Sequence, residues 1–149
     1  MDLLDAVRAF FDAMQWPNAP TEDGSSLVLR FDGENGSFPF YVTSRNDHQQ
    51  LLVYALFPTD FAPERREALA MLLTRANHGM VIGNFEADLD TGEVRYKTSL
   101  DLEEAEVSLA LIRNLVRANV LTMDHYFPAL EALVTSDCTP EEALAGIEP

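Results

Sequence analysis

The sequence predicts a single α+β domain over residues 1–149, with an antiparallel β-sheet of about five strands packed by helices in the order α-β-β-β-α-β-β-α. Two pairs of short strand-like runs, each joined by a turn that contains Asp and Gly, indicate antiparallel hairpins. Helical periodicity precedes, separates and follows these pairs without strict alternation, which favours α+β over a parallel α/β sheet.

The N-terminal segment has the i, i+3, i+4 apolar spacing of an amphipathic helix, with Asp2 placed as a cap. Trp16-Pro17 ends this helix, because the residue before proline is pushed out of the helical region. The polar residues 18–26 then predict a loop. The apolar positions of the helix are Leu3, Leu4, Val7, Phe10, Phe11 and Met14.

Three strands are expected next, over residues 27–31, 38–44 and 50–57. The cluster Asp32-Gly33-Glu34-Asn35-Gly36 between the first two is turn chemistry, so these strands form a hairpin. Pro63 is placed to begin a second helix, and His78-Gly79 to end it.

A second hairpin is predicted from residues 80–89 and 93–100, around the turn Asp90-Thr91-Gly92. From about Asp101 to Val134 the pattern is helical, and Pro128 predicts a kink or a break between Asn119 and Pro128. A short last helix is expected from Pro140, with acidic residues in its first turn.

The net charge of −15 comes from 25 acidic and 10 basic residues. A strongly negative surface repels nucleic acid and anionic lipid and favours basic partners, and it also keeps a protein soluble without any partner. The middle of the chain is nearly neutral, because half of the basic residues lie there, namely Arg65, Arg66, Arg75, Arg95 and Lys97.

The sequence predicts a cytoplasmic protein, because it shows neither a secretory signal nor a membrane-spanning segment. The first 14 residues contain three aspartates rather than the basic start and clean apolar run of a secretory signal. No apolar run is long enough to span a membrane. Cys138 is the only cysteine, so no internal disulfide is possible, which fits a reducing compartment.

No motif in the sequence predicts catalysis or metal binding. Asp88-Leu89-Asp90-Thr91-Gly92-Glu93 resembles the start of a calcium loop, but its glycine comes one place early and a third acidic ligand is missing, so we interpret it as a hairpin turn. His48, His78, His125 and Cys138 lack zinc-ligand spacing. Cys138 follows Asp137, which disfavours a reactive thiolate.

Nucleophile elbows and phosphate-binding loops are absent, since the seven glycines are scattered singly. We therefore assign no catalytic, cofactor-binding or metal-ligating residue and expect no cofactor. The protein is not expected to be an enzyme, and the sequence does not identify its partner-binding residues.

Arg95 and Lys97 alternate along a predicted strand and so point to one face. They form either a partner-facing stripe or cross-strand pairs with Glu86 or Asp88, and the second interpretation is favoured because such pairs are routine in hairpins. Gly83 in a strand marks a bulge or a close backbone approach, which we expect from the long C-terminal helix or from a second copy of the chain.

Five segments of the chain carry a resemblance to a known family, and they are Ala76-Asn77-His78-Gly79, residues 83–86, residues 90–98, residues 118–124 and residues 126–130. With these segments the chain resembles the YbjN family of bacterial proteins. The similarity covers most of the chain and is weakest before about residue 25 and after Val134.

The resemblance implies a fold like that of class I type III secretion chaperones, which are small acidic α+β units, often dimeric, that bind client segments. It also implies an antiparallel sheet with helices on one side and a homodimer. The family is described as sensory transduction regulators, and it supplies no catalytic residues to carry over. Because one fold hosts many functions, the resemblance indicates a fold more directly than a function.

Three hypotheses of function follow. The first is a cytoplasmic, homodimeric, non-catalytic module that binds an unidentified protein, in a chaperone-like or regulatory role, with no nucleic acid and no membrane as partner. The second is a small-ligand sensor with a pocket between the sheet and the long C-terminal helix, lined by Phe40, Tyr54, Phe57 and Phe85. The third is an enzyme, for which no visible motif fills the required roles.

Overall fold

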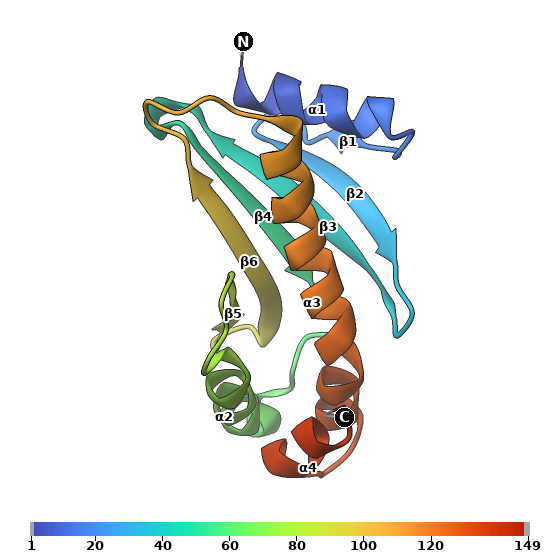
Figure 1. The fold of residues 1–149 in the computed structure, drawn as a ribbon. Coiled ribbons are helices and arrows are strands. Elements are labelled where there is room, and N and C mark those ends of the chain that lie inside the picture. The colour runs from blue at the N-terminus through green and yellow to red at the C-terminus, as the bar shows by residue number, and fades with distance from the viewer. Residues whose placement is uncertain (1, 148–149) are drawn as a thin grey trace.

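The computed structural model describes residues 2–147, and in it a six-stranded antiparallel sheet carries helices on one face (Figure 1). The strands are ordered β1-β2-β3-β4-β6-β5 across the sheet. The elements are α1 (Leu3–Ala13), β1 (Ala19–Pro20), β2 (Ser26–Asp32), β3 (Ser37–Arg45), η1 (Asn46–His48), β4 (Gln50–Leu56), η2 (Pro63–Arg65), α2 (Arg66–Asn77), β5 (Asn84–Asp88), β6 (Glu93–Asp101), α3 (Leu109–Thr135) and α4 (Pro140–Ala145).

The predicted α+β class and antiparallel sheet are confirmed, with one strand more than expected. The additional strand, β1, has two residues and lies within the segment that we predicted to be a loop. It pairs with β2 through Ala19 and Pro20. A strand this short has no alternating pattern to detect, which is why the sequence did not reveal it.

The N-terminal helix begins as predicted, because an Asp2 carboxylate oxygen accepts a hydrogen bond from the Leu4 backbone N–H at 3.0 Å. It ends at Ala13, and its apolar face packs on β2, β3 and α3. Met14, which we placed on that face, is instead 60% exposed because it lies just beyond the helix.

The two predicted hairpins are present. β2 and β3 pair from Ser26↔Thr43 to Asp32↔Ser37, with Gly33–Gly36 as the turn. β5 and β6 pair from Asn84↔Lys97 to Asp88↔Glu93. In both turns Asp and Gly stand where the backbone reverses, and this local chemistry determined the prediction.

The long helix α3 differs from the prediction at both of its notable points. It begins at Leu109 rather than near Asp101, with the Ser108 hydroxyl accepting a hydrogen bond from the Leu111 N–H at 3.1 Å. It then runs to Thr135 as one helix that includes Pro128, so the expected break is absent. Proline has no N–H to donate to the carbonyl of residue i−4, here Asp124.

The β2–β3 turn compensates for Pro128. The Asn35 side-chain amide donates a hydrogen bond to the Asp124 carbonyl at 3.2 Å, so the acceptor that Pro128 leaves free is satisfied. The Asp124 carboxylate in turn accepts the backbone N–H groups of Glu34 at 3.1 Å and Asn35 at 2.9 Å. The turn and the helix therefore hold each other in place.

Replacing Asn35 with alanine should lower the free energy of unfolding by about 1 kcal/mol, because the buried Asp124 carbonyl then lacks its partner. Pro128→Ala restores a backbone N–H at that position. In the Asn35→Ala, Pro128→Ala double variant the loss should therefore shrink, as measured by urea denaturation of the four proteins of the cycle. Additive effects would show that Asn35 does not compensate for Pro128.

The strand before the second turn is shorter than predicted, since β5 begins at Asn84 rather than at Met80. Gly83 has φ +78, and a Cβ at this position would lie 2.5 Å from the Lys97 carbonyl oxygen and 2.8 Å from Cγ2 of Thr98. The close approach that we predicted at Gly83 is thus made by the neighbouring strand β6. It is not made by the long helix, and no second copy of the chain is needed to explain it.

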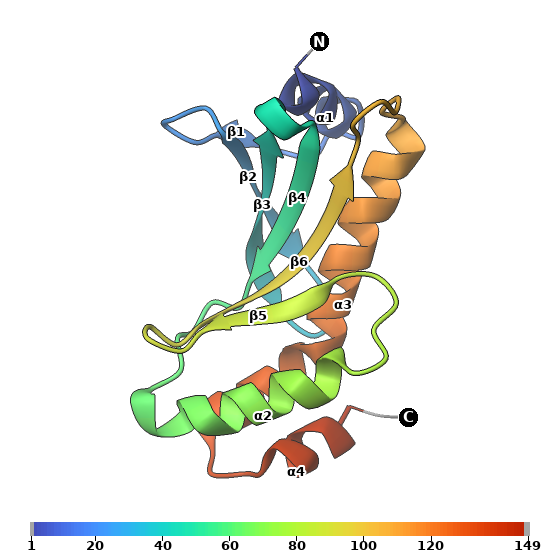
Figure 2. The ribbon, with the colours of Figure 1, turned by 90° about the vertical axis from the view of Figure 1, so that its left-hand side faces the viewer.

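The core lies between the sheet and the layer formed by α1 and α3 (Figures 1 and 2). Helix α4 packs against α3, and α2 packs against α4 and β5. Strand side chains alternate between this core and the other face. Figure 2 shows α3 on one side of the sheet and no helix of the described residues over the opposite side of β2, β3 and β4. The fold is therefore two layers, with one sheet face uncovered.

Candidate functional site

The uncovered sheet face is the candidate site for binding another protein. Tyr41 of β3 is paired with Tyr54 of β4, and Tyr54 with Lys97 of β6, so the three side chains form one row across the strands. Leu52 and Leu56 lie on the same face of β4 as Tyr54. These side chains are half-buried, since they stand beside one another on paired strands and no helix lies over this face.

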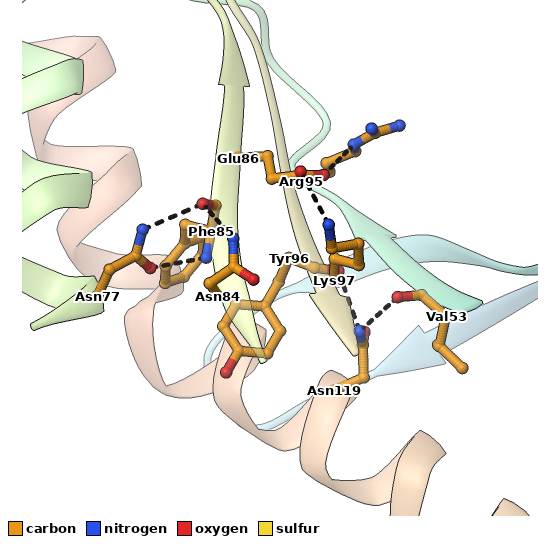
Figure 3. Close-up of polar contacts among 9 residues, drawn as sticks. All are labelled: Val53, Asn77, Asn84, Phe85, Glu86, Arg95, Tyr96, Lys97 and Asn119. Carbon is orange, nitrogen blue, oxygen red and sulfur yellow. Dashed lines mark hydrogen bonds and ion pairs between the residues drawn. The ribbon is translucent and has the colours of Figure 1, made fainter. Parts of the chain in front are cut away.

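Arg95 and Lys97 form a charged cluster with Glu86 beside this row (Figure 3). Arg95 Nε lies 2.9 Å from Glu86 Oε1, and Lys97 Nζ lies 3.1 Å from Glu86 Oε2. The Arg95 guanidinium also stacks over the Tyr54 ring, 4.2 Å from its centroid. The predicted cross-strand pair is therefore confirmed with Glu86 as the partner, and the two cations remain on the uncovered face.

Two opposing influences act on the Glu86 carboxyl. Its burial raises the pKa, but the hydrogen bonds and positive charges of Lys97 and Arg95 outweigh this and hold the pKa below its ordinary value. Glu86 is thus ionised at neutral pH and neutralises part of the positive charge. One carboxylate facing two cations leaves the cluster with a net positive charge on a chain of −15.

Asn119 of α3 supports this part of the sheet from the core side (Figure 3). It is fully buried, and its Nδ2 donates to the Val53 and Tyr96 carbonyl oxygens, both at 2.9 Å, and to the Thr98 hydroxyl at 3.3 Å. The amide therefore bridges β4 and β6 directly beneath Tyr54 and Lys97. It fixes the spacing of the two strands that carry the charged row.

The outer edge of β5 is closed by a second asparagine, Asn77, at the end of α2. The Phe85 N–H donates to Asn77 Oδ1 at 2.7 Å, and Asn77 Nδ2 donates to the Phe85 carbonyl at 3.1 Å. One side chain thus imitates a neighbouring strand and blocks pairing with another chain at this residue. Apart from their presence in the segments that carry the family resemblance, neither Asn77 nor Asn119 could be recognised from the sequence.

The remaining cations of the middle segment bind within the chain. Arg65 donates to the Leu133 carbonyl at 3.1 Å and the Cys138 carbonyl at 2.8 Å, which ties η2 to the end of α3. Arg66 donates to the Asp90 carbonyl at 2.8 Å and so holds the β5–β6 turn. Arg75 forms an ion pair of 2.8 Å with Glu141 of α4. These three residues stabilise the fold rather than form a separate basic patch.

The segment that resembles a calcium loop is a hairpin turn, as we interpreted it. The Asp88 carboxylate accepts the Asp90 N–H at 2.9 Å, and Gly92 takes φ +84. Residues 2–147 contain no group of three or more His, Cys, Asp or Glu residues arranged to hold a metal ion. No helix in the same residues is both long and apolar enough to cross a membrane.

The aromatic residues proposed for a ligand pocket do not share one. Phe40, Phe57 and Phe85 are buried in the core at 0%, 4% and 3% exposure, where they pack on other aromatic rings. Tyr54 lies on the opposite face of the sheet. The structure therefore gives no support to a small-ligand site between the sheet and α3.

Comparison with solved structures identifies the fold. A crystal structure of YbjN from E. coli, described as "a putative transcription regulator", superposes with a TM-score of 0.67 at 17% identity, covering 87% of this chain and 89% of that one. A chain of the ExsC–ExsE complex superposes with a TM-score of 0.57 at 14% identity, covering 91% of this chain and 99% of that one. The chain thus has the type III secretion chaperone-like fold expected from the resemblance.

A search of curated proteins gave no match. The chain matches a family model over residues 3–132, nearly the whole of the described chain. The family is YbjN, described as "putative bacterial sensory transduction regulator". That range includes the uncovered sheet face, the Glu86–Arg95–Lys97 cluster and both supporting asparagines. The protein belongs to the YbjN family.

Proposed function

We propose that the protein is a non-catalytic module that binds a segment of another protein, in a chaperone-like or regulatory role, as an acidic homodimer in the cytoplasm. The observation that carries this proposal is the uncovered sheet face, where Tyr41, Tyr54 and two leucines lie beside Arg95 and Lys97. Aromatic and arginine side chains supply most of the energy in protein interfaces. A sheet face with this composition fits a protein partner better than a small molecule.

The comparisons support the same proposal from a different direction. One of the chains that superpose on this protein comes from a complex of two proteins, ExsC and ExsE. The dimer rests on the resemblance to dimeric chaperones. The charge of −15 favours partners that are basic overall and disfavours nucleic acid and anionic membranes.

Tyr54→Ala should weaken capture of the partner about tenfold in a tagged pull-down from the native host, since removing a central aromatic from an interface costs roughly 1–2 kcal/mol or more. Met14→Ala is the matched control, because Met14 is 60% exposed and lies at the end of α1, away from the uncovered face. Capture should also fall as salt rises, because opposite charges steer the encounter.

Light scattering after size-exclusion chromatography on the same preparations tests the dimer. A particle of twice the chain mass supports the homodimer. A monomer that captures nothing at low salt contradicts the proposal, as does equal capture by Tyr54→Ala and Met14→Ala proteins that are both folded.

A further inference from the structure

Strand β6 is longer than the strand beside it. β4 pairs with β6 from Arg95 to Asp101, whereas β5 pairs with β6 only from Glu93 to Lys97. Among the described residues, the stretch Thr98–Asp101 therefore has a neighbouring strand on one side only. We call this stretch the open edge.

The backbone of the open edge directs its free groups outward. The Leu102 N–H donates to the Gln49 carbonyl at 2.8 Å, and the Phe57 N–H donates to the Val94 carbonyl at 3.0 Å, so the even-numbered residues of this stretch bond toward β4. In an antiparallel ladder successive residues bond to opposite sides. The N–H and C=O groups of Ser99 and Asp101 thus point away from β4, and both residues are exposed.

Gly83 explains why β5 leaves the open edge unpaired. Gly83 lies beside Thr98, and its positive φ bends the chain there, so the residues that precede Gly83 do not continue along β6. The chain then exposes two apolar side chains, Val81 at 94% and Ile82 at 57%. This loop remains anchored to β6, because the Tyr96 hydroxyl donates to the Ile82 carbonyl.

Helix α3 borders the open edge from the core side. The Thr98 hydroxyl donates to the Leu115 carbonyl at 3.0 Å, which brings the first turns of α3 against this part of β6. One turn earlier Leu111 is 38% exposed. Exposed apolar side chains therefore lie on both elements that neighbour the open edge, the Val81–Ile82 loop and the first turns of α3.

The other edges of the sheet are protected in part, although Leu29–Asp32 of β2 also pair with a strand on one side only. Asn77 binds both backbone groups of Phe85 on β5. On the opposite side β1 contains Pro20, and the Trp16 indole N–H donates to the Arg30 carbonyl of β2 at 3.1 Å. Unprotected edges bind additional strands readily. The open edge differs from these edges because no described side chain binds the outward backbone groups of Ser99 and Asp101.

The acidic residues at the end of the open edge favour a partner strand with a basic side chain. Asp101, Glu103, Glu104 and Glu106 are exposed, and none of them forms an ion pair with a described basic residue. A partner strand with a lysine or arginine at this end complements them. A second copy of the chain instead brings its own acidic residues to the same edge, which opposes pairing at this place.

We propose that the open edge Thr98–Asp101 binds an extended segment of a partner protein as a seventh strand of the sheet. Apolar side chains of the segment contact Val81, Ile82 and Leu111, and a basic residue lies beside Asp101 and the glutamates that follow it. Main-chain hydrogen bonds to Ser99 and Asp101 supply the affinity, and the flanking side chains supply the specificity. The inference rests on the proposed protein-binding function and assigns the binding mode.

Ser99→Pro tests the backbone contact directly, with Ser99→Ala as the matched control. Proline removes an N–H that β4 does not use, and an edge strand tolerates proline where the N–H faces outward. The probe is a panel of peptides of about seven residues, alternating apolar residues with threonine and carrying two lysines at one end. Ser99→Pro should weaken binding about tenfold or more by fluorescence anisotropy, whereas Ser99→Ala should bind like the wild type.

Hydrogen exchange and a second variant keep the test decisive if Ser99→Pro misfolds. On binding, the Ser99 and Asp101 amides should become protected in the wild-type protein. Val81→Asp, at a site 94% exposed and thus neutral for folding, should weaken the same peptides. A panel without any binder, or equal binding by folded Ser99→Pro and Ser99→Ala proteins, overturns the proposal.

Two further outcomes separate this inference from the proposed function. If Ser99→Ala is a dimer and Ser99→Pro is a monomer, the open edge belongs to a second copy, and a partner segment is ruled out there. If Ser99→Pro captures the same proteins as the wild type in the pull-down, protein binding stands and the open edge is not its site.

Discussion

Replacing Asn119 with aspartate should lower the free energy of unfolding by about 3 kcal/mol or more at neutral pH. The side-chain amide of Asn119 is fully buried, and its Nδ2 faces three oxygen acceptors, the Val53 and Tyr96 carbonyls and the Thr98 hydroxyl. A carboxylate of the same shape places a negative charge against the two carbonyl oxygens. Its other oxygen takes the place of Asn119 Oδ1, which has no hydrogen-bond donor among the described residues.

The pH dependence distinguishes a buried charge from a simple packing defect. Burial beside acceptors raises the folded-state pKa of the new carboxyl above its unfolded value. The loss in free energy of unfolding that ionisation causes is therefore complete above the folded-state pKa of this carboxyl. It shrinks as pH falls through that pKa, and it disappears below the unfolded-state pKa near 4. Urea denaturation of Asn119→Asp across this range should show stability recovering toward that of the wild type as pH falls.

Asn119→Ala supplies the control, since it deletes the donor without adding a charge. Each acceptor carbonyl keeps its ladder partner within the β4–β6 pairing, so this variant should lose less than Asn119→Asp at neutral pH, and its loss should not vary with pH. Equal losses for the two variants, independent of pH, would show that Asn119 only fills space between α3 and the sheet.

Features set by a few neighbouring residues could be predicted from the sequence. The two hairpin turns, the Asp2 cap and the α4 helix each depend on residues within four positions of one another. At α4, Thr139 caps the helix, and the Glu142 carboxylate accepts a hydrogen bond from the Thr139 N–H at 3.1 Å. The cross-strand pair of Arg95 with Glu86 belongs with them, because a correct hairpin fixes which side chains face each other.

Features that depend on distant partners could not be predicted in this way. Pro128 is compatible with a continuous helix because Asn35, far earlier in the sequence, satisfies the Asp124 carbonyl. Proline chemistry alone predicts a break, and only the folded chain supplies the compensating donor. The start of α3 is different, since Ser108 is a recognisable cap that the apolar periodicity of the preceding residues concealed.

The candidate site shows the same division. Sequence alternation placed Arg95 and Lys97 on one face, but it contained no information about which face the helices cover. That depends on α1 and α3 packing on the same side, which leaves Tyr41 and Tyr54 uncovered. The open edge of β6 depends on the length difference between two paired strands, and a predicted β5 that began at Met80 concealed it.

Replacing Gly92 with alanine should destabilise the protein by about 3 kcal/mol. Gly92 ends the β5–β6 turn with φ +84, and its carbonyl accepts the Phe61 N–H at 2.9 Å. A Cβ here would overlap the Phe61 carbonyl oxygen and lie 2.8 Å from the Phe61 nitrogen. Because Phe61 is buried at 1% exposure and these atoms are backbone, they cannot rotate away as a side chain could.

Gly79 separates the two causes of this effect, because it has the same φ of +84 and no atom within 4 Å of the site of a Cβ. Gly79→Ala should therefore cost only the backbone penalty, about 1–2 kcal/mol. The excess loss in Gly92→Ala, measured by urea denaturation of both variants, reports how rigidly Phe61 is held against the turn. If the two alanines cost the same, the segment at Phe61 moves aside freely, and the β5–β6 hairpin that carries Arg95 and Lys97 is less firmly fixed to the core than the structure indicates.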